Sequence, residues 1–421
     1  MTKRTQKQDQ TKVQTIASRA TTYLMKLRAV ASDKRKVNLE ALRREVTAIR
    51  TEAVEKLTER IEPTIEALEA NGFQVHLVYS LADAYKTLAK LTEGHRYLVK
   101  SKSNMVNRVL TGHKLKTAPV ETDLGDFVAD ALKTKDVHPV LPAVGLSAKI
   151  IAKKLKKVIG KNVVATPEGI ASAVRGYLRE KIYKATLGLT GANAITLDGS
   201  IVILENEGNI SLITRCPDTH VVVAGVEKIV KDLSEATTIS HASAVWGTNQ
   251  YMPSYVNIIS GPSKTADIES TTITGAQGAK EVHVILIDTR KALPEEFHTL
   301  LQCINCGACL DVCDAYLASD SAGSSSSAGK SQYKGIKYLA EELIDGKPAP
   351  DLVFKCSTCK ACTEICPAGI PLRDIMIRLR EYCVEHETTP KELESMISNI
   401  RKTGNPFARK KATLDDKLYC C

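Results

Sequence analysis

Eight of the twelve cysteines fall into two runs with the same spacing, Cys-x2-Cys-x2-Cys-x3-Cys. The first run is Cys303, Cys306, Cys309 and Cys313, and the second is Cys356, Cys359, Cys362 and Cys366. In bacterial ferredoxins three close thiolates of such a run bind one 4Fe-4S cluster, while the fourth binds the other cluster. We therefore predict two 4Fe-4S clusters whose fourth ligands are exchanged, so that Cys366 completes the first site and Cys313 the second.

Two other uses of these cysteines fit less well. A structural zinc site usually has two cysteine pairs separated by a longer loop, which these compact runs lack. Disulfides are disfavoured because cysteines two residues apart bridge poorly and nothing in the sequence indicates an oxidising compartment. Pro367 follows the second run, as is typical of ferredoxins, whereas Asp314 follows the first. Of the remaining cysteines, Cys216 and Cys383 are expected to be small apolar fillers, and Cys420 and Cys421 could be reactive thiols.

The elements around the two runs are predicted to be helical. The 42-residue spacer begins with a Ser/Gly-rich stretch, residues 319–331, which is typical of a flexible loop. Apolar residues then recur at helical spacing over 336–344, and Pro371 stands near the start of another helical pattern. We therefore predict a helical two-cluster ferredoxin domain over residues 294–386, followed by a helical tail, 387–421, that ends in Cys-Cys.

Upstream, the pattern changes from helical to α/β. Apolar residues at spacings of three and four predict a long amphipathic helix over residues 39–70, within a basic helical arm formed by 1–70. Residues 71–293 alternate short β-branched runs with helical segments, which indicates an α/β domain with a mostly parallel sheet. Polar turns with glycines follow or separate several strands, where open α/β sheets bind ligands.

Charge and composition restrict the functional classes. The net charge of +10 is concentrated at the N-terminus, since residues 1–60 hold 15 Lys/Arg against 7 Asp/Glu. No basic run is interleaved with aromatic residues, so a solvated helical surface is favoured and no nucleic-acid partner is expected. The longest segment without acidic or basic residues, 236–263, is too polar to span a bilayer. No apolar segment follows the N-terminal charges, so we expect no secretory signal and a cytoplasmic location.

Six motifs in a fixed order carry a resemblance to a known family. They are Lys-Ser-Lys-Ser at 100–103, Glu-Thr-Asp-Leu-Gly at 121–125, Thr-Gly-Ala-Asn-Ala at 190–194, the eleven residues 199–209, Gly-Val-Glu-Lys-Ile-Val at 225–230 and the nine residues 261–269. On these motifs residues 40–385 resemble the lactate-utilisation protein B family. The resemblance implies a cytoplasmic iron-sulfur subunit of a three-component system that oxidises L-lactate to pyruvate. It also implies an α/β domain similar to the ribose-5-phosphate isomerase and CoA-transferase superfamily.

The resemblance directs attention to five candidate binding residues. Glu205, in Glu-Asn-Glu-Gly-Asn, looks like the catalytic glutamate of CoA transferases. Lys102, Asn193, Ser263 and Lys264 are the donors that we expect to bind a small carboxylate. One cluster residue departs from the family pattern, because Lys360 stands where the family usually has glycine and where the first run has Gly307.

Electron counting indicates that this chain works with partners. Oxidation of a 2-hydroxy acid removes two electrons, whereas each cluster passes one at a time. No flavin fingerprint is visible, so we expect the two-electron acceptor on a partner subunit and no catalysis by this chain alone. Residues 403–407, Thr-Gly-Asn-Pro-Phe, support an alternative role as a heterodisulfide-reductase-like thiol/disulfide redox subunit. A third interpretation makes the α/β domain an independent isomerase or transferase.

Overall fold

The computed structural model describes residues 37–133, 143, 146–319, 335–346 and 350–407. Most of the expected basic arm, most of the Ser/Gly-rich stretch and the terminal Cys420 and Cys421 lie outside the described residues. Within them, no helix is both long and apolar enough to cross a membrane.

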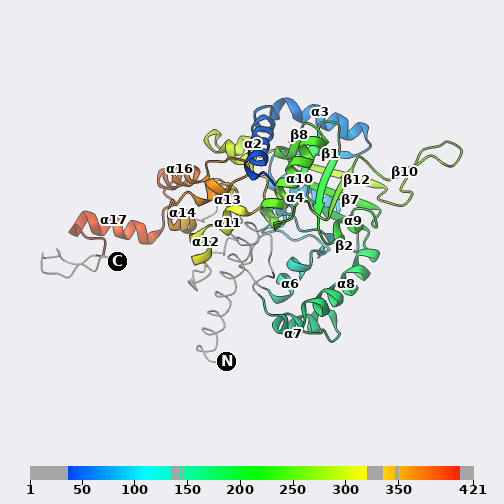
Figure 1. Ribbon diagram of the computed structural model, residues 1–421, viewed down its shortest axis with the longest axis horizontal. Helices are drawn as coiled ribbons and strands as arrows, with labels where there is room; N and C mark the ends of the chain where they lie inside the picture. The colour runs from blue at the N-terminus through cyan, green and yellow to red at the C-terminus, as the bar shows by residue number, and fades with distance from the viewer. Residues whose placement is uncertain (1–36, 134–142, 144–145, 320–334, 347–349, 408–421) are drawn as a thin grey trace.

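The centre of the α/β region is a six-stranded sheet with the order β1-β12-β7-β4-β2-β3 (Figure 1). All five strand pairings are parallel, which confirms the mostly parallel sheet. The strands in this order are Gln74–Val78, Glu281–Ile287, Thr219–Gly225, Leu187–Thr190, Leu98–Lys100 and Val120–Glu121. Parallel strands need crossover segments that cover the faces, and the short apolar runs seen in the sequence are therefore buried on both sides.

Alternate residues of the central strands enter two different cores. Val222 and Val284 pack against α3 (Leu57–Ala70) on one face. Val223 and Ile285 face the opposite way, toward α4 (Leu81–Leu91) and α5 (Asn104–Leu110). This alternation follows from the two-residue repeat of a β-strand.

Smaller elements surround this sheet. A second sheet has the order β8-β5-β6-β9, formed by Ile229–Val230, Ala194–Thr196, Ile201–Glu205 and Tyr255–Ile259. A hairpin of β10 (Lys264–Thr265) and β11 (Ile273–Thr274) extends away from the molecule (Figure 1). The remaining elements of this region are α6 (Leu124–Leu132), α7 (Ala148–Ile159), α8 (Pro167–Lys184), α9 (Asn209–Ile213), the short helix η1 (Val226–Lys228) and α10 (Leu233–Thr248).

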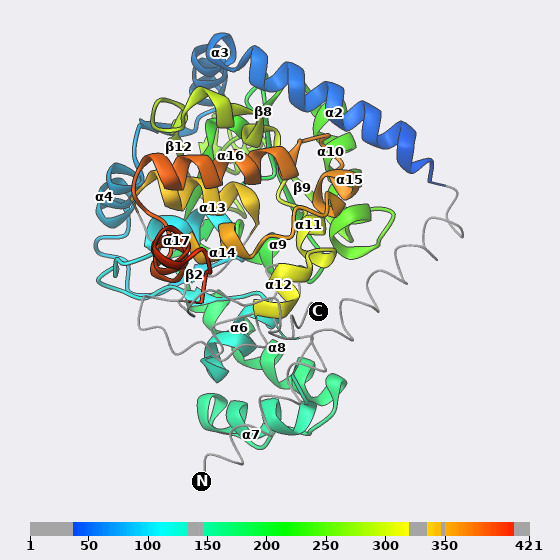
Figure 2. The same cartoon turned by 90° about the vertical axis from the view of Figure 1, so that its left-hand side faces the viewer.

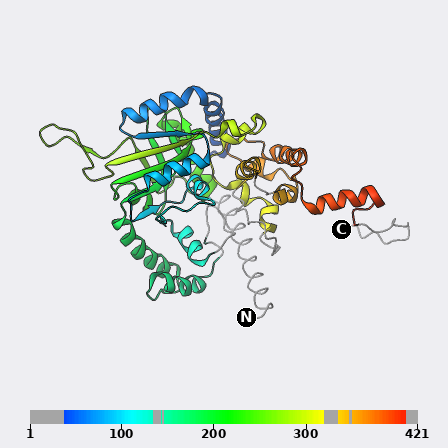
Figure 3. The ribbon, with the colours of Figure 1, turned by 180° about the vertical axis from the view of Figure 1, so that it is seen from behind.

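The C-terminal region is helical, as predicted for a ferredoxin domain whose cluster loops are joined by helices. It lies beside the sheet, and its last helix projects outward (Figure 3). Its helices are η2 (Arg290–Ala292), η3 (Glu295–Gln302), α11 (Ala308–Asp311), α12 (Asp314–Ser319), α13 (Ile336–Ile344), α14 (Pro350–Lys355), α15 (Ala361–Ile365), α16 (Leu372–Glu385) and α17 (Lys391–Thr403).

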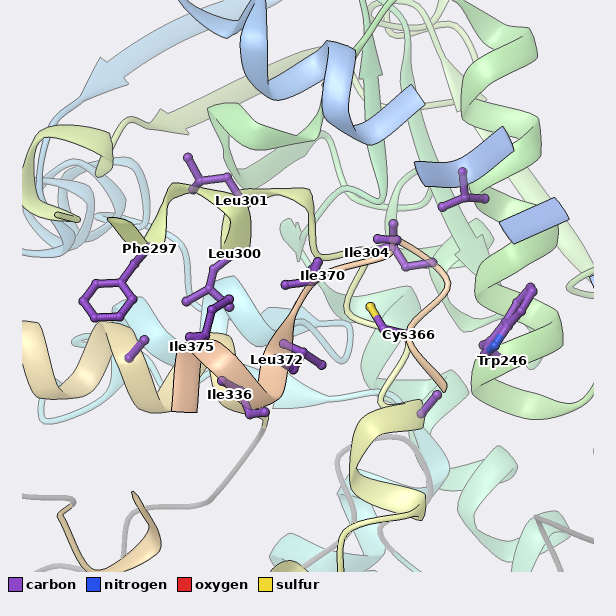
Figure 4. Packing of buried hydrophobic residues seen from close by; sticks show 14 of the residues in the cluster. Trp246, Phe297, Leu300, Leu301, Ile304, Ile336, Cys366, Ile370, Leu372 and Ile375 are labelled. Carbon is purple, nitrogen blue, oxygen red and sulfur yellow. The ribbon is translucent and has the colours of Figure 1, made fainter. Parts of the chain in front are cut away.

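The expected long helix over residues 39–70 is two helices, α2 (Leu39–Glu55) and α3, divided at Lys56. In Figure 2 they run along one side of the molecule, beside both the sheet and the C-terminal helices. Residues of α2 share one apolar core with α10, η3, α13 and α16. Figure 4 shows part of this core, where Phe297 and Leu300 lie near the C-terminal helices and Trp246 projects from α10.

Buried ion pairs also connect the two regions. The Glu227 carboxylate, next to β7, lies 2.7 Å from the Lys337 ammonium on α13. The Arg108 guanidinium on α5 lies 2.7 Å from the Glu341 carboxylate on the same helix. All four residues are less than 10% exposed. Burial alone would raise the pKa of Glu227, but Lys337 and Lys228 outweigh it and lower that pKa to about 2.

Removing either charge of the Glu227–Lys337 pair should destabilise the protein. Glu227→Gln or Lys337→Met should each lower the free energy of unfolding by about 3–5 kcal/mol, because the partner is left buried and uncompensated. The double variant should recover much of that loss. Urea unfolding of the cluster-loaded protein measures all three.

A matched control is the exposed pair of Asp83 and Lys86, 3.0 Å apart, where Lys86→Met should cost about 0–1 kcal/mol. The Glu227 contribution should be lost as the pH falls from 4.5 toward 2, because the unfolded carboxyl binds its proton first. Equal losses for Lys86→Met and Lys337→Met would contradict a stabilising role for the buried pair.

Candidate metal centres and the adjoining cavity

The two cysteine loops have the same backbone conformation. Asn305 and Gly307 in the first loop have φ of 59° and 79°, and Thr358 and Lys360 in the second have 58° and 70°. In each loop a backbone N–H donates to the first cysteine: Asn305 N to Cys303 Sγ and Thr358 N to Cys356 Sγ, both at 3.4 Å. Hydrogen bonds to the sulfur atoms are typical of iron-sulfur sites. Both loops therefore fit the same kind of group.

The fourth cysteine of each run lies near the other run. Burial raises the pKa of Cys309, and the charges of Cys303, Cys306 and Cys366 raise it further. Burial also raises the pKa of Cys313, with added contributions from Cys356 and Cys359. The short helices α11 and α15, which follow the two loops, pack against each other and bring the runs together.

Among the described residues, no group of three or more His, Cys, Asp or Glu side chains is arranged around one point as a single metal ion requires. A 4Fe-4S group is larger, and its cysteines lie around four irons. Within the second run the cysteines differ in depth, because Cys366 is buried whereas Cys359 is exposed.

A cavity of about 500 Å³ lies between the α/β region and the first cysteine loop. Its wall includes residues at the ends of three neighbouring strands: residues 101–104 after β2, 191–193 after β4, and Gly225, Glu227 and Lys228 at and after the end of β7. From β2 the chain passes to β3 on one side, whereas from β4 it passes to β7 on the other. The cavity therefore lies outside the carboxyl ends of the strands at a topological switch point, where open α/β sheets bind ligands.

The opposite wall is formed by the cysteines. Cys303, Cys306, Cys309 and Cys366 all line the cavity, whereas the other four cysteines of the two runs are not among its lining residues. Gly247 on α10 permits this close approach, because a Cβ there would stand 3.1 Å from the Cys306 carbonyl oxygen. A molecule in this cavity would touch both the strand ends and the first cysteine set.

The structure brings together three of the five residues suggested for carboxylate binding. Lys102, Asn193 and Glu205 line the cavity. Ser263 and Lys264 do not: the Lys264 ammonium donates to the Asn71 carbonyl at 2.9 Å, at the base of the β10–β11 hairpin. The glycine-bearing turn at 261–269 resembles the others in sequence, but it leads into an exposed hairpin and not to the switch point.

Glu205 has a structural task at the cavity wall. Its carboxylate accepts hydrogen bonds from Ile210 N at 2.6 Å, Ser211 N at 2.9 Å and Asn257 Nδ2 at 2.8 Å, and also from the Ser211 hydroxyl. These donors fix the turn before α9. The comparison with the catalytic glutamate of CoA transferases therefore has no support here, since a carboxylate engaged by four donors is poorly available as a nucleophile.

Several charged residues of the cavity were not singled out from the sequence. Lys228, Asp123 and Glu207 line it together with Lys102. Burial and the neighbouring Asp123 raise the pKa of Glu207 to about 7. All three lie within motifs noted in the sequence, at 225–230, 121–125 and 199–209, but nothing local distinguished them from ordinary turn residues.

Comparison with known proteins supports both regions. The LUD domain family matches residues 61–287, and the 4Fe-4S dicluster domain family matches residues 299–370. The dicluster match shows that the chain binds two 4Fe-4S clusters.

Curated relatives extend over most of the chain. "Lactate utilization protein B" of Bacillus pumilus is 30% identical over 383 residues, which are 87% of this chain and 77% of that protein. "Uncharacterized electron transport protein YkgF" of Escherichia coli is 29% identical over 368 residues, 85% of this chain and 75% of that protein. A crystal structure of a DUF162 family protein from Deinococcus radiodurans aligns with a TM-score of 0.32 and 13% identity, over 55% of this chain and 98% of that one. The chain belongs to the lactate utilization protein B family, in which a LUD domain is joined to a 4Fe-4S dicluster domain.

Proposed function

We propose that this chain is the iron-sulfur electron-transfer subunit of a multi-subunit complex that oxidises L-lactate to pyruvate in the cytoplasm. The observation that carries the proposal is the shared cavity, whose wall includes the ends of β2, β4 and β7 together with Cys303, Cys306, Cys309 and Cys366. The names of the relatives, lactate utilization and electron transport, agree with it. The bound clusters supply one-electron transfer.

The ligand sets in this proposal are crossed. The first cluster is held by Cys303, Cys306, Cys309 and Cys366, and the second by Cys356, Cys359, Cys362 and Cys313. The charge of Cys303 contributes to raising the pKa of Cys366, and the charges of Cys356 and Cys359 contribute to raising the pKa of Cys313, which supports this pairing. The first set lines the cavity and the second includes the exposed Cys359. Electrons accordingly pass from the cavity through the first cluster to the second and leave at the surface.

The division of labour between subunits follows from the chemistry. Lactate gives up two electrons, so a two-electron acceptor such as a flavin is required next to the substrate. In this proposal that acceptor belongs to a partner subunit, and this chain is not catalytic alone. Residues 71–293 form the lactate-utilisation domain and 294–386 the ferredoxin domain.

The heterodisulfide-reductase-like role is the second candidate. One observation favours it: the Thr-Gly-Asn-Pro-Phe turn at 403–407 is held by a hydrogen bond from Asn399 Nδ2 to the Pro406 carbonyl at 3.0 Å, and Phe407 is 73% exposed. A shaped, exposed turn at the end of α17 fits a contact with a redox partner.

Replacing Cys313 tests the crossed ligands. Cys313→Ala should remove the same cluster as Cys359→Ala, and the iron content should fall from about eight to about four atoms per chain. The electron paramagnetic resonance signal that survives should be the one that Cys306→Ala abolishes. Cys383→Ala is the control, because Cys383 is buried outside both runs, and it should keep both signals. Loss of the Cys306-dependent signal in Cys313→Ala would contradict the crossing.

Reduction experiments test the role as an electron-transfer subunit. The cluster-loaded chain should be reduced by dithionite and should stay oxidised with L-lactate alone, because it lacks a two-electron acceptor. Addition of its partner subunits should then permit lactate-dependent bleaching of the iron-sulfur absorption. Bleaching of the single chain by lactate at roughly 1–10 turnovers per second would make this polypeptide itself the dehydrogenase. Bleaching that requires a thiol instead of lactate would favour the second candidate.

A further inference from the structure

The cations of the cavity differ in whether the protein already neutralises them. Lys102, Arg108, Lys228 and Lys337 all line it. Three of these have a carboxylate within ion-pair distance. Lys102 lies 2.9 Å from Asp126, Arg108 lies 2.7 Å from Glu341, and Lys337 lies 2.7 Å from Glu227. The Lys228 ammonium has neither an ion pair nor a hydrogen bond to any residue that the structure describes. It is therefore the cavity cation that is left for a ligand.

Because Lys228 is buried, the lack of an ion pair or hydrogen bond to its ammonium is costly. The residue is 8% exposed and lies at the end of η1, directly after the central strand β7. A buried ammonium loses hydration, and here only its attraction to Glu227 and to Cys303 offsets that loss. The attraction to Glu227 is shared, because that carboxylate is already paired with Lys337. An incoming anion would supply the missing partner.

Two hydroxyl groups of the cavity are also unsatisfied. Ser101 Oγ, at the end of β2, and Ser243 Oγ, on α10, are buried and have no hydrogen-bond partner. Ser101 is only 1% exposed. Buried polar groups in folded proteins are normally hydrogen-bonded, so these two call for a bound group. A hydroxyl can donate to a carboxylate or accept from an alcohol.

Two of the acidic residues that line the cavity, Asp123 and Glu207, lie toward the β3 edge of the sheet. Glu227 and Glu341 also line it, but they are already paired with Lys337 and Arg108. Asp123 follows β3, whereas Lys228 follows β7, and β4 and β2 lie between those strands. Three strand spacings of about 4.8 Å place the two positions roughly 14 Å apart. Glu207 also belongs to the acidic side, since it accepts a hydrogen bond from Leu124 N, next to Asp123. A second carboxylate on a ligand would meet repulsion there.

We infer that Lys228 binds the carboxylate of a short monocarboxylic 2-hydroxy or 2-oxo acid, with the Ser101 and Ser243 hydroxyls as further hydrogen-bonding partners. The inference deepens the proposed function, because it takes the cavity as the place where substrate or product binds. It adds a selectivity: the ligand must carry one negative charge, and neutral or dicarboxylic analogues are disfavoured.

Calorimetric titration of the cluster-loaded chain tests this binding without turnover. Pyruvate and L-lactate should bind, whereas lactamide, the neutral analogue, and malate, with a second carboxylate, should bind more weakly. Lys228→Met should weaken pyruvate binding about 10- to 100-fold, as expected for loss of a charge-assisted hydrogen bond. Lys228→Arg, which keeps the charge, should retain more affinity than Lys228→Met. Lys264→Met, outside the cavity, should bind like wild type.

Two results would overturn the inference: equal binding of lactate and lactamide by the wild type, and unchanged pyruvate affinity in Lys228→Met. If the reduction potential of a cluster changes in that variant while its pyruvate affinity does not, Lys228 serves the cluster near Cys303. The wild-type comparison needs no variant, so it holds even if Lys228→Met fails to fold. Failure of lactate-dependent bleaching with partners, beside intact Lys228-dependent binding, would contradict the proposed function alone.

Discussion

The arrangement of the two regions depends on one buried guanidinium. Arg50, on α2 and 2% exposed, donates to the carbonyl oxygens of Glu227 at 2.6 Å, Leu301 at 2.7 Å and Gln302 at 3.1 Å. The first of these belongs to the segment that follows β7, and the other two lie immediately before Cys303. A planar group with five donors can hold three carbonyls in a fixed geometry, which a lysine cannot. Arg50 therefore sets how far the strand ends stand from the first cysteine loop.

The interface between the α/β region and the C-terminal region contains this guanidinium, buried ion pairs and an apolar core. Glu227 and Lys337 are paired across it, and the residues of α2, α10 and η3 pack around it. Apolar packing tolerates small shifts, whereas a buried ion pair is stable only when both charges meet. The pairs therefore specify one relative position of the two regions, and the packing stabilises it. This is the position in which the cavity has two walls.

Local sequence patterns predicted the secondary structure and the cysteine motifs. The roles of individual cavity residues depend on contacts between segments far apart in the sequence. The helical region and the parallel sheet follow from periodicities within ten to twenty residues, and the cysteine spacing lies within eleven. The pairing of Glu227 with Lys337 joins residues 110 positions apart, so no local signal could identify Lys228 as the cation left without a partner. Ser263 and Lys264 lie in a polar, glycine-bearing turn like those of the cavity residues. The order of the strands in the sheet, which the sequence does not reveal, decides which of these turns lie at the switch point. Glu205 had a suggestive sequence context, and only its hydrogen-bond partners revealed a structural task.

The shared wall makes cofactor assembly and ligand binding interdependent. Because Cys303, Cys306, Cys309 and Cys366 all line the cavity, a chain without its first cluster has a different cavity from the loaded one. Any ligand that prefers the loaded form stabilises that form by the same factor by which loading increases the ligand's affinity. If the proposed ligand binds in this cavity, loss of the first cluster would therefore also weaken its binding. A saturated cavity would, by reciprocity, protect the metal centre against damage by oxygen.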